Sequence, residues 1–484
     1  MSDRRSGNQV PDNGIGPRSN GRRAAARNIV RDHEASREPE GRRAVIGARF
    51  TAGLVVAASL ATCAAVADVD VDALAAFENR PVTEIRLTGY KVTREYVITR
   101  EIRTRVGEPL HAATLIADVQ RLENLSVFAQ IGVVAEADGA GVRLLFRFKE
   151  MPAFIPLAGA SYTEQDGFSA GPKLSALNLS GRDISLSARA YFGSTKQVAA
   201  SLSWPWIGGN HVSFDFRGAR LSRTDTLNEF KETSYEFTPS VGTYLGEHGR
   251  LAGKFSLFRM SSDVAGKTLS PDNHDVLPRL GASLGWDTRD SWNYPRHGWL
   301  NELEVWRTGG PLGGDADFWS MNLDLRRWVP TAKRQRLSLS SLLSLQSGTV
   351  GEDLPVYLIY RMGGANSIRG YTIDDLGRQL YGKNQLIGTA EYSFNLLPLR
   401  RWDIWKFPLR LGLEFALFAD TGIAWSEPRD FALKRARAGA GGGLRLLVPG
   451  SEMVRFDVGW SEEGGFQFHF ASGSKAAAQR LRLR

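Results

Sequence analysis

The feature that most constrains the fold is an alternation of polarity that begins at Pro152 and runs to Ala471. This stretch divides into roughly sixteen segments of about ten residues, separated by turn residues, as in a transmembrane β-barrel. Segments of this length suit a tilted strand that crosses the hydrocarbon of a bilayer. A spanning sheet must close on itself, because each strand satisfies its backbone groups only through its neighbours. The pattern predicts a transmembrane β-barrel of about sixteen antiparallel strands.

Alternation also occurs in soluble β-sandwiches, so a second property is needed to choose between the two folds. Tryptophan recurs near the expected strand ends, for example at Trp204, Trp286 and Trp402. Aromatic belts at both bilayer interfaces have this distribution. The sequence therefore favours a membrane barrel over a sandwich.

The first 67 residues predict an export signal. Residues 1–49 are basic and lack apolar periodicity, which is typical of disordered chain, and residues 50–66 form a short apolar run that ends in small residues. We expect a signal peptide cleaved after Ala67, followed by a linker over residues 68–81; lipoprotein processing at Cys63 is the alternative. Much of the net charge of +9 lies in this leader, so the charge gives no reason to expect nucleic-acid binding.

Residues 82–151 follow a different pattern, which predicts a small α+β domain. A strand is followed by two amphipathic helices and two further strands, in the order β-α-α-β-β. Thr93 is the expected N-cap of the first helix, and the turn at Asp138-Gly139 joins the last two strands.

The longest interruption of the strand series, residues 349–381, contains the run from Ile368 to Tyr371, and a structureless loop of that length is usually functional. Its apolar, cationic and aromatic side chains favour insertion of the loop into the barrel. An Arg in the lumen must be paired and hydrogen-bonded. The alternation places Asp420 and Glu391 on the lumenal face as partners for Arg369. The alternative is an exposed loop with a solvated Arg.

Taken together, these segments resemble the BamA- and TamA-type outer-membrane assembly and secretion superfamily, in a form with one POTRA domain. The motifs that carry the resemblance are Ile85-x-Leu87-x-Gly89, Gly107-Glu108-Pro109-Leu110, the loop motif Ile368-Arg369-Gly370-Tyr371, and Phe418-Ala419-Asp420-Thr421-Gly422 on the expected thirteenth strand. The resemblance implies that the loop motif meets the lumenal residues Asp420, Glu391, Phe418 and Gly422. It also implies that the long loop is extracellular and that residues 82–151 are periplasmic.

The last expected strand resembles the C-terminal signal by which barrels are recognised for assembly. Gly465, Phe468 and Phe470 carry this resemblance. The family usually ends at this last aromatic residue, whereas the present chain continues into a basic tail, residues 472–484. An even number of strands returns the chain to the periplasm, so we expect the tail there.

The function that the resemblance implies is the assembly and insertion of outer-membrane proteins, at a seam where the first strand meets the last. An open sheet edge can pair with an incoming client strand. The implied partners are the bilayer of the bacterial outer membrane and unfolded outer-membrane or secreted client polypeptides, with periplasmic chaperones and accessory lipoproteins as further candidates. The alternatives are secretion of a partner polypeptide through the lumen and a passive porin. We expect no enzyme and no cofactor, because the histidines lack metal-ligand spacing.

Overall fold

The computed structural model describes residues 67–69, 74–163, 167–207, 211–225, 229–292, 294–404, 407–447 and 453–472. Except for residues 67 and 472, the predicted leader, signal peptide and basic tail lie outside the described residues. In the described part of the chain, no helix is both long and apolar enough to cross a membrane.

In its described residues, the N-terminal domain is a four-stranded sheet with the helices α3 and α4. Its elements are β1 (Ala67–Val69), β2 (Val82–Thr88), α3 (Glu95–Thr99), α4 (Ala112–Asn124), β3 (Phe128–Asp138) and β4 (Gly141–Glu150). The strand order is β1-β3-β4-β2, with β3 antiparallel to β4 and with β1 and β2 parallel to their neighbours. The sequence did not predict β1, which lies in the segment expected to be the end of the signal peptide and a linker.

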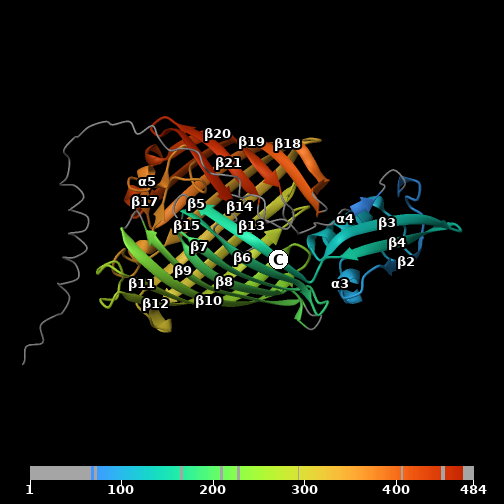
Figure 1. The fold of residues 1–484 in the computed structure, drawn as a ribbon, viewed down its shortest axis with the longest axis horizontal. Helices are drawn as coiled ribbons and strands as arrows, with labels where there is room; N and C mark the ends of the chain where they lie inside the picture. The colour runs from blue at the N-terminus through green and yellow to red at the C-terminus, as the bar shows by residue number, and fades with distance from the viewer. Residues whose placement is uncertain are drawn as a thin grey trace, which may run out of the picture. The chain divides into compact units, whose positions relative to one another are not determined.

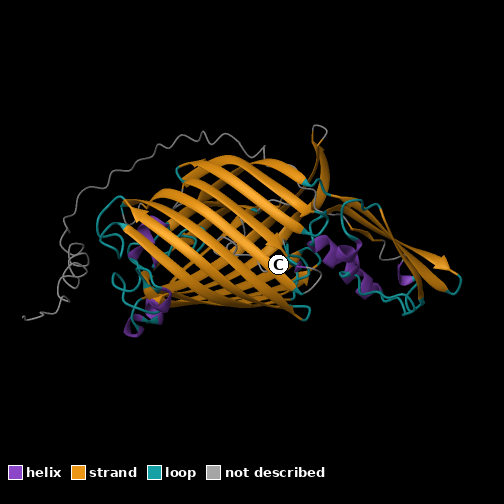
Figure 2. Cartoon of the chain, turned by 90° about the horizontal axis from the view of Figure 1, so that it is seen from below, coloured by secondary structure: helices purple, strands orange, loops and turns teal. Residues whose placement is uncertain are grey.

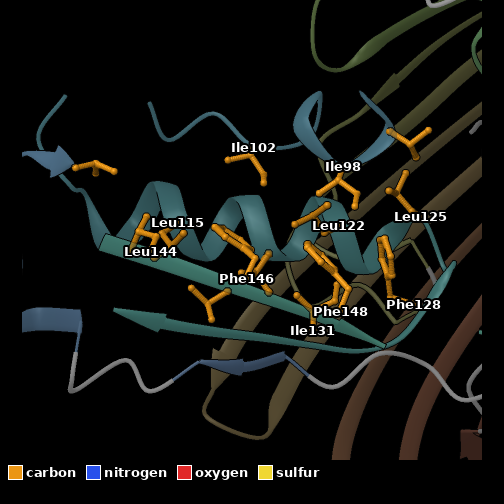
Figure 3. Close-up of a cluster of buried hydrophobic side chains, with 14 of the residues drawn as sticks. Ile98, Ile102, Leu115, Leu122, Leu125, Phe128, Ile131, Leu144, Phe146 and Phe148 are labelled. Carbon is orange, nitrogen blue, oxygen red and sulfur yellow. The ribbon is translucent and has the colours of Figure 1, made fainter. Parts of the chain in front are cut away.

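The core of this domain lies between α4 and the sheet (Figure 3). Leu115, Val119 and Leu122 are buried on one face of α4 because they recur at helical spacing. They face the sheet, where the rings of Phe128 and Phe148 pack with their centroids 4.7 Å apart. A small domain thus obtains a continuous apolar core from one helix face and one sheet face.

A hydrogen bond between distant elements replaces the expected cap of α3. Thr93 does not cap this helix, whose N-cap is Arg94 without a side-chain hydrogen bond. Instead the Thr93 hydroxyl donates to Glu150 Oε1 at the end of β4, with an O···O distance of 2.5 Å. Burial would raise the pKa of Glu150, but hydrogen bonds from Thr93 and from nearby backbone N–H groups hold this pKa below its usual value.

The rest of the described chain forms a sixteen-stranded antiparallel sheet that curves into a barrel (Figures 1 and 2). Its strands are β5 (Phe154–Thr163), β6 (Gly167–Leu179), β7 (Ile184–Gly193), β8 (Lys196–Trp204), β9 (Val212–Asp225), β10 (Phe230–Leu245), β11 (Gly249–Ser262), β12 (His274–Asp287), β13 (Gly298–Gly309), β14 (Asp317–Ala332), β15 (Gln335–Gln346), β18 (Asn384–Ile404), β19 (Phe407–Trp425), β20 (Arg437–Leu447), β21 (Val454–Ser461) and β22 (Gly465–Ser472). Each strand pairs with the next in sequence, and β15 pairs with β18 across the long loop. The prediction of a sixteen-stranded barrel is confirmed.

The two faces of the barrel wall differ in polarity, as the alternation predicted. Outward side chains are apolar and exposed, for example Phe237 at 50%, Leu251 at 45% and Trp286 at 50%. Inward side chains include Ser256 and Asp324, which are both buried. An apolar outer face and a polar interior are what a barrel in a bilayer requires.

The long loop between β15 and β18 has regular structure of its own, contrary to the expectation of a structureless segment. It contains η4 (Val356–Leu358), β16 (Tyr360–Arg361), α5 (Ile373–Leu376) and β17 (Tyr381–Gly382). β16 pairs with β17 in a two-stranded ladder at the base of the loop. Three further short turns, η3 (Gly310–Leu312), η5 (Pro428–Asp430) and η6 (Leu433–Arg435), lie in other connections. The motif residues 368–371 therefore sit between two paired segments that limit their path.

The seam is the junction between β5 and β22, which stand at the two ends of the strand order. Among the described residues, these two strands are not neighbours in the hydrogen-bonded ladder. A side-chain contact spans the seam instead, because the rings of Tyr162 and Phe470 lie 5.6 Å apart between centroids. The seam is therefore the place where the barrel wall is held by side chains.

Candidate functional site

The tip of the long loop packs against the inside of the barrel wall. Its side chains form a buried cluster with residues of β18 and β19, comprising Met362, Ile368, Tyr371, Leu376, Leu380, Ile387 and Ala424. Gly422 makes room for this cluster, since a methyl group there would lie 3.1 Å from Cδ1 of Ile368. The apolar and aromatic members of the loop motif are thus buried against the wall.

Arg369 forms a bidentate ion pair with Asp420 of β19. Its Nε donates to Asp420 Oδ2 at 2.7 Å and its Nη2 to Oδ1 at 3.0 Å, while its backbone N–H also donates to Oδ2 at 3.1 Å. Both side chains are 0% exposed. Thr389 of β18 donates a further hydrogen bond to Asp420 Oδ1 at 2.9 Å. Parallel N–H···O bonds of this kind fix orientation as well as distance.

The remaining terminal nitrogen of Arg369 bonds carboxylates on two other strands. Nη1 donates to Glu391 Oε2 of β18 and to Asp457 Oδ2 of β21, both at 3.2 Å. The guanidinium carbon also lies 3.4 Å from the ring centroid of Phe418 on β19, a cation–π arrangement. One side chain of the loop thereby connects three strands of the wall.

Two further arginines complete the ionic cluster. Arg445 of β20 donates to Asp457 Oδ1 at 2.5 Å and to Glu391 Oε2 at 2.9 Å. Arg455 of β21 donates to Asn366 Oδ1 of the loop at 2.7 Å and lies 3.8 Å from Asp457 Oδ2. With Arg369 and Asp420, the cluster contains three guanidinium groups and three carboxylates. Such balance is what the burial of charges requires.

The backbone of Gly370 bonds the last two strands. Its N–H donates to Nε2 of His469 on β22 at 3.2 Å, and its carbonyl accepts from Oγ of Ser461 on β21 at 2.6 Å. His469 and Ser461 are both buried. The loop motif is therefore joined to the strand that borders the seam.

Glycines of the wall allow the loop backbone to approach this closely. A methyl group at Gly439 of β20 would lie 1.9 Å from the carbonyl oxygen of Arg369, and one at Gly459 of β21 would lie 2.5 Å from the nitrogen of Gly370. Gly370 itself has φ of +107°, a conformation that favours glycine. These positions form a slot for the loop motif that larger residues would fill.

The predicted site residues fall into two separate groups in the structure. The first group meets inside the barrel and consists of Ile368, Arg369, Gly370, Tyr371, Glu391, Phe418, Asp420 and Gly422. The second group lies on β22 and faces away from the loop: Phe468 is 81% exposed, Gly465 begins the strand with φ of +64°, and Phe470 contacts Tyr162 and Phe456.

Sequence reasoning missed four residues that contact the motif or its partners, namely Arg445, Asp457, Ser461 and His469. A signal for them exists, because all four lie on inward positions of strands whose outward positions are apolar. Inward charge alone does not identify a partner, however, since many inward positions of this barrel are charged.

The contacts of this site serve to hold the loop in place. In the described part of the chain, no group of His, Cys, Asp and Glu is arranged to bind a metal ion. A Gly-x-Ser-x-Gly pattern does occur at residues 281–285, but it lies within β12. A nucleophile elbow needs a sharp turn from strand to helix, so Ser283 has the geometry of an inward strand residue.

Comparison with known families assigns both parts of the chain. The Omp85 superfamily domain matches residues 178–475, and the POTRA family, described as a surface antigen variable number repeat, matches residues 81–151. Among curated proteins, the chain is 25% identical over 362 residues to the outer membrane protein assembly factor BamA of Nitratidesulfovibrio vulgaris, covering 72% of this chain and 44% of that protein. It is 24% identical over 382 residues to BamA of Neisseria meningitidis serogroup B, covering 71% and 46%. The chain thus spans less than half the length of these relatives.

Solved structures show the same fold. BamA from Haemophilus ducreyi lacking POTRA domains 1–3 superposes with a TM-score of 0.53 at 16% identity, covering 81% of this chain and 83% of that one. CdiB from Escherichia coli superposes with a TM-score of 0.52 at 15% identity, covering 82% and 74%. The Omp85 domain accounts for more than half of the 484 residues. The chain therefore belongs to the Omp85 superfamily, as an outer-membrane β-barrel protein with one POTRA domain in the periplasm.

Proposed function

We propose that this protein assembles or inserts outer-membrane proteins by offering the strand edges at its seam to client strands. Members of its family act in assembly and transport rather than as enzymes, and the finer assignment to insertion is the proposal. The observation that carries it is the contact between Tyr162 and Phe470, which spans the seam through side chains where every other pair of adjacent strands is joined by a ladder. Among the described residues, a client strand that enters there displaces side-chain contacts and no ladder of hydrogen bonds between β5 and β22.

The energetics of strand pairing in a bilayer support this step. An unpaired backbone group in the hydrocarbon is costly, because no water is present to satisfy it. A client strand that pairs with β5 or β22 satisfies its own groups and those of the edge together. Pro156, which lies in β5, has no N–H to donate, and proline in a strand belongs at edges. The free energy for insertion then comes from client pairing and burial, without a nucleotide.

The loop motif has a supporting role in this proposal. Arg369 and Gly370 connect the long loop to strands on the C-terminal side of the seam, including β22 through His469. We assign these contacts the task of holding β22 in a defined position while β5 separates from it. The loop tip stays packed against the inside of the wall during this separation.

The experiment that tests the proposal measures client folding directly. The full chain is reconstituted into lipid vesicles, an unfolded eight-stranded barrel is added from the periplasmic side, and folding is followed by the heat-dependent shift in gel mobility. The control vesicles contain an unrelated barrel of similar size. Faster client folding with this chain than with the control supports insertion.

Equal folding rates in the two kinds of vesicle would rule the proposal out. Depletion in cells then separates the other functions of an outer-membrane barrel. Loss of many barrels from the outer-membrane proteome agrees with an insertase. Loss of one secreted polypeptide indicates a dedicated translocator, and altered solute uptake with an unchanged proteome indicates a porin.

A further inference from the structure

The outer face of the barrel carries a cluster of cations where its apolar band ends. On the adjacent strands β8 to β11, the outward positions include Lys196, Arg220, Lys231 and Arg259, and all four are exposed. We call these residues the basic rim patch. The outward positions of these four strands include no Asp or Glu. All charges at the outward positions of these four strands are therefore positive.

Strand register brings members of the patch side by side. Tyr235 of β10 pairs with Arg220 of β9 on one side and with Arg259 of β11 on the other. Nε of Arg220 donates to the Tyr235 hydroxyl at 3.1 Å, which fixes the position of one guanidinium on the outer face. In the next outward row, Thr233 donates to Ser222 at 3.1 Å. Cations and hydroxyls thus share one small area.

The patch lies at the extracellular edge of the bilayer. The POTRA domain is periplasmic and precedes β5, so the strand ends that carry the long loop are extracellular. Arg220 lies near the extracellular end of β9, and Arg259 near that of β11. Toward the periplasm, the outward positions become apolar. On β9, Gly218 and then Phe216 follow Arg220, and on β11, Leu257 follows Arg259. Outward charges are tolerated near an interface and are costly at the midplane.

On the inner face of the same strands, cations are paired with carboxylates of the protein. Arg250 on β11 donates to Asp215 at 2.5 Å, Lys254 lies 2.9 Å from Glu304, and Arg223 is paired with Glu232. A charge facing the lumen thus meets a carboxylate of the protein. In the basic rim patch, by contrast, Arg220 donates to a hydroxyl group, that of Tyr235. The carboxylate beside the patch, Asp263, accepts from the backbone N–H of Lys231 at 2.8 Å. The patch faces the bilayer, which supplies the anions of lipid head groups.

We infer that the basic rim patch binds the phosphate groups of an anionic glycolipid in the outer leaflet. Guanidinium groups bind phosphate through paired N–H···O contacts, and the neighbouring hydroxyls suit a polar sugar head group. Phe237 and Leu257, directly below the patch, offer an apolar surface for acyl chains. The inference rests on the charge of the outer surface and does not depend on the proposed function.

The test compares two lipids and two variants. The full chain is folded in neutral detergent, and native mass spectrometry measures the binding of diphosphoryl lipid A and of the same lipid without its phosphates. The variant is Arg220→Gln with Arg259→Gln. The matched control is Arg327→Gln, which removes an outward cation near the periplasmic end of β14. The Arg327 guanidinium lies 4.8 Å from the ring centroid of Trp299. Heat-dependent gel mobility verifies that each variant is folded.

We expect the double variant to bind diphosphoryl lipid A roughly 25-fold more weakly, since each basic residue near an anionic surface contributes about fivefold. The control should bind as the wild type does, and the lipid without phosphates should bind weakly to all three proteins. Equal binding by the double variant and the wild type overturns the inference, as does equal loss in the control. Displacement of the lipid by inorganic phosphate alone at low millimolar concentration would also overturn it, because the site would then recognise free phosphate.

Discussion

The backbone N–H of Gly370 donates a hydrogen bond to Nε2 of His469, with a distance of 3.2 Å between the two nitrogens. This bond connects the loop motif to β22, the strand at the seam. A ring nitrogen can accept only when it carries no proton, so this bond uses Nε2 of His469 as an acceptor. The last strand therefore contributes more to the protein than an outward aromatic signal, since one of its inward side chains holds the loop.

Substitution of His469 should loosen the loop without unfolding the barrel. A lost neutral hydrogen bond costs about 1 kcal/mol, so His469→Ala should expose the loop tip roughly fivefold more often. Arg369 is 0% exposed, and trypsin cleavage after it reports this exposure. His469→Gln retains an acceptor and serves as the control. Equal cleavage of His469→Ala and wild type would show that this bond does not hold the loop.

The ion pair between Arg369 and Asp420 should dominate the anchoring of the loop. Removing one partner of a buried pair costs about 3–5 kcal/mol, so Arg369→Ala and Asp420→Asn should each release the loop and reduce client assembly. Arg369→Lys keeps the charge but loses the two parallel hydrogen bonds, and it should also be impaired. Assembly assays with proteins of verified heat-dependent gel mobility measure this effect. Full activity of all three variants would show that client assembly does not need this anchor of the loop.

Added volume in the slot should act like loss of the ion pair. Gly459→Ala places a methyl group 2.5 Å from the nitrogen of Gly370, and overpacking of this kind costs about 1–3 kcal/mol. Gly253→Ala is the matched control, because a methyl group there has nothing within 4 Å. Hydrogen exchange of the amides in residues 362–371 should rise in the first variant and not in the second. A rise in both would point to a general effect of alanine in strands.

Closing the seam covalently should stop client assembly. Cysteines in place of Tyr162 and Phe470, whose ring centroids are 5.6 Å apart, can be joined by oxidation or by a short bis-thiol reagent. The control pair replaces Phe456 and Phe470, whose centroids lie 4.9 Å apart within the paired strands β21 and β22. We expect assembly to be lost on crosslinking of the first pair and restored on its reversal. Unchanged assembly by a crosslinked seam would favour transport through the lumen.

A single buried carboxylate should control the stability of the POTRA domain. Asp118 of α4 is 0% exposed, and it accepts hydrogen bonds from the backbone N–H groups of Arg103 at 2.9 Å and Thr104 at 3.0 Å. Asp118→Ala leaves these donors unsatisfied and removes the carboxylate that pairs with Arg121, so local stability should fall by about 3–5 kcal/mol. Hydrogen exchange in α4 and β4 measures the loss. Glu84→Gln, at an exposed ion pair, should leave the stability nearly unchanged.

Local pattern was sufficient to predict the barrel, the order of elements in residues 82–151 and the inward orientation of Asp420 and Glu391. These follow from periodicity, which acts along a single strand or helix. Apart from the pairing of Arg369 with Asp420 and Glu391, contacts set by tertiary structure were not accessible in this way. Thr93 bonds Glu150 instead of capping its helix, because a residue distant in sequence competes for its hydroxyl.

The partners of Gly370 show the same limit. Alternation places His469 and Asp457 inward, yet the path of the loop decides which inward residues it meets. That path depends on the β16 and β17 ladder and on the absence of side chains at Gly439 and Gly459. β1 was missed because three residues carry too little periodicity to mark a strand.

The contacts of the loop motif also have a mechanical consequence. The hydrogen bonds that Arg369 and Gly370 make to the wall end on β18, β19, β21 and β22, and these strands form a continuous stretch of the wall with β20. From inside the lumen, the loop motif connects these strands to one another and so makes this stretch of the wall rigid. The last strand of this stretch is β22, and β5 lies on the other side of the seam. We therefore expect β5 and the strands that follow it to move more easily than β18 to β22. The seam should then open by displacement of β5 away from a rigid β22, and not by uniform widening of the barrel.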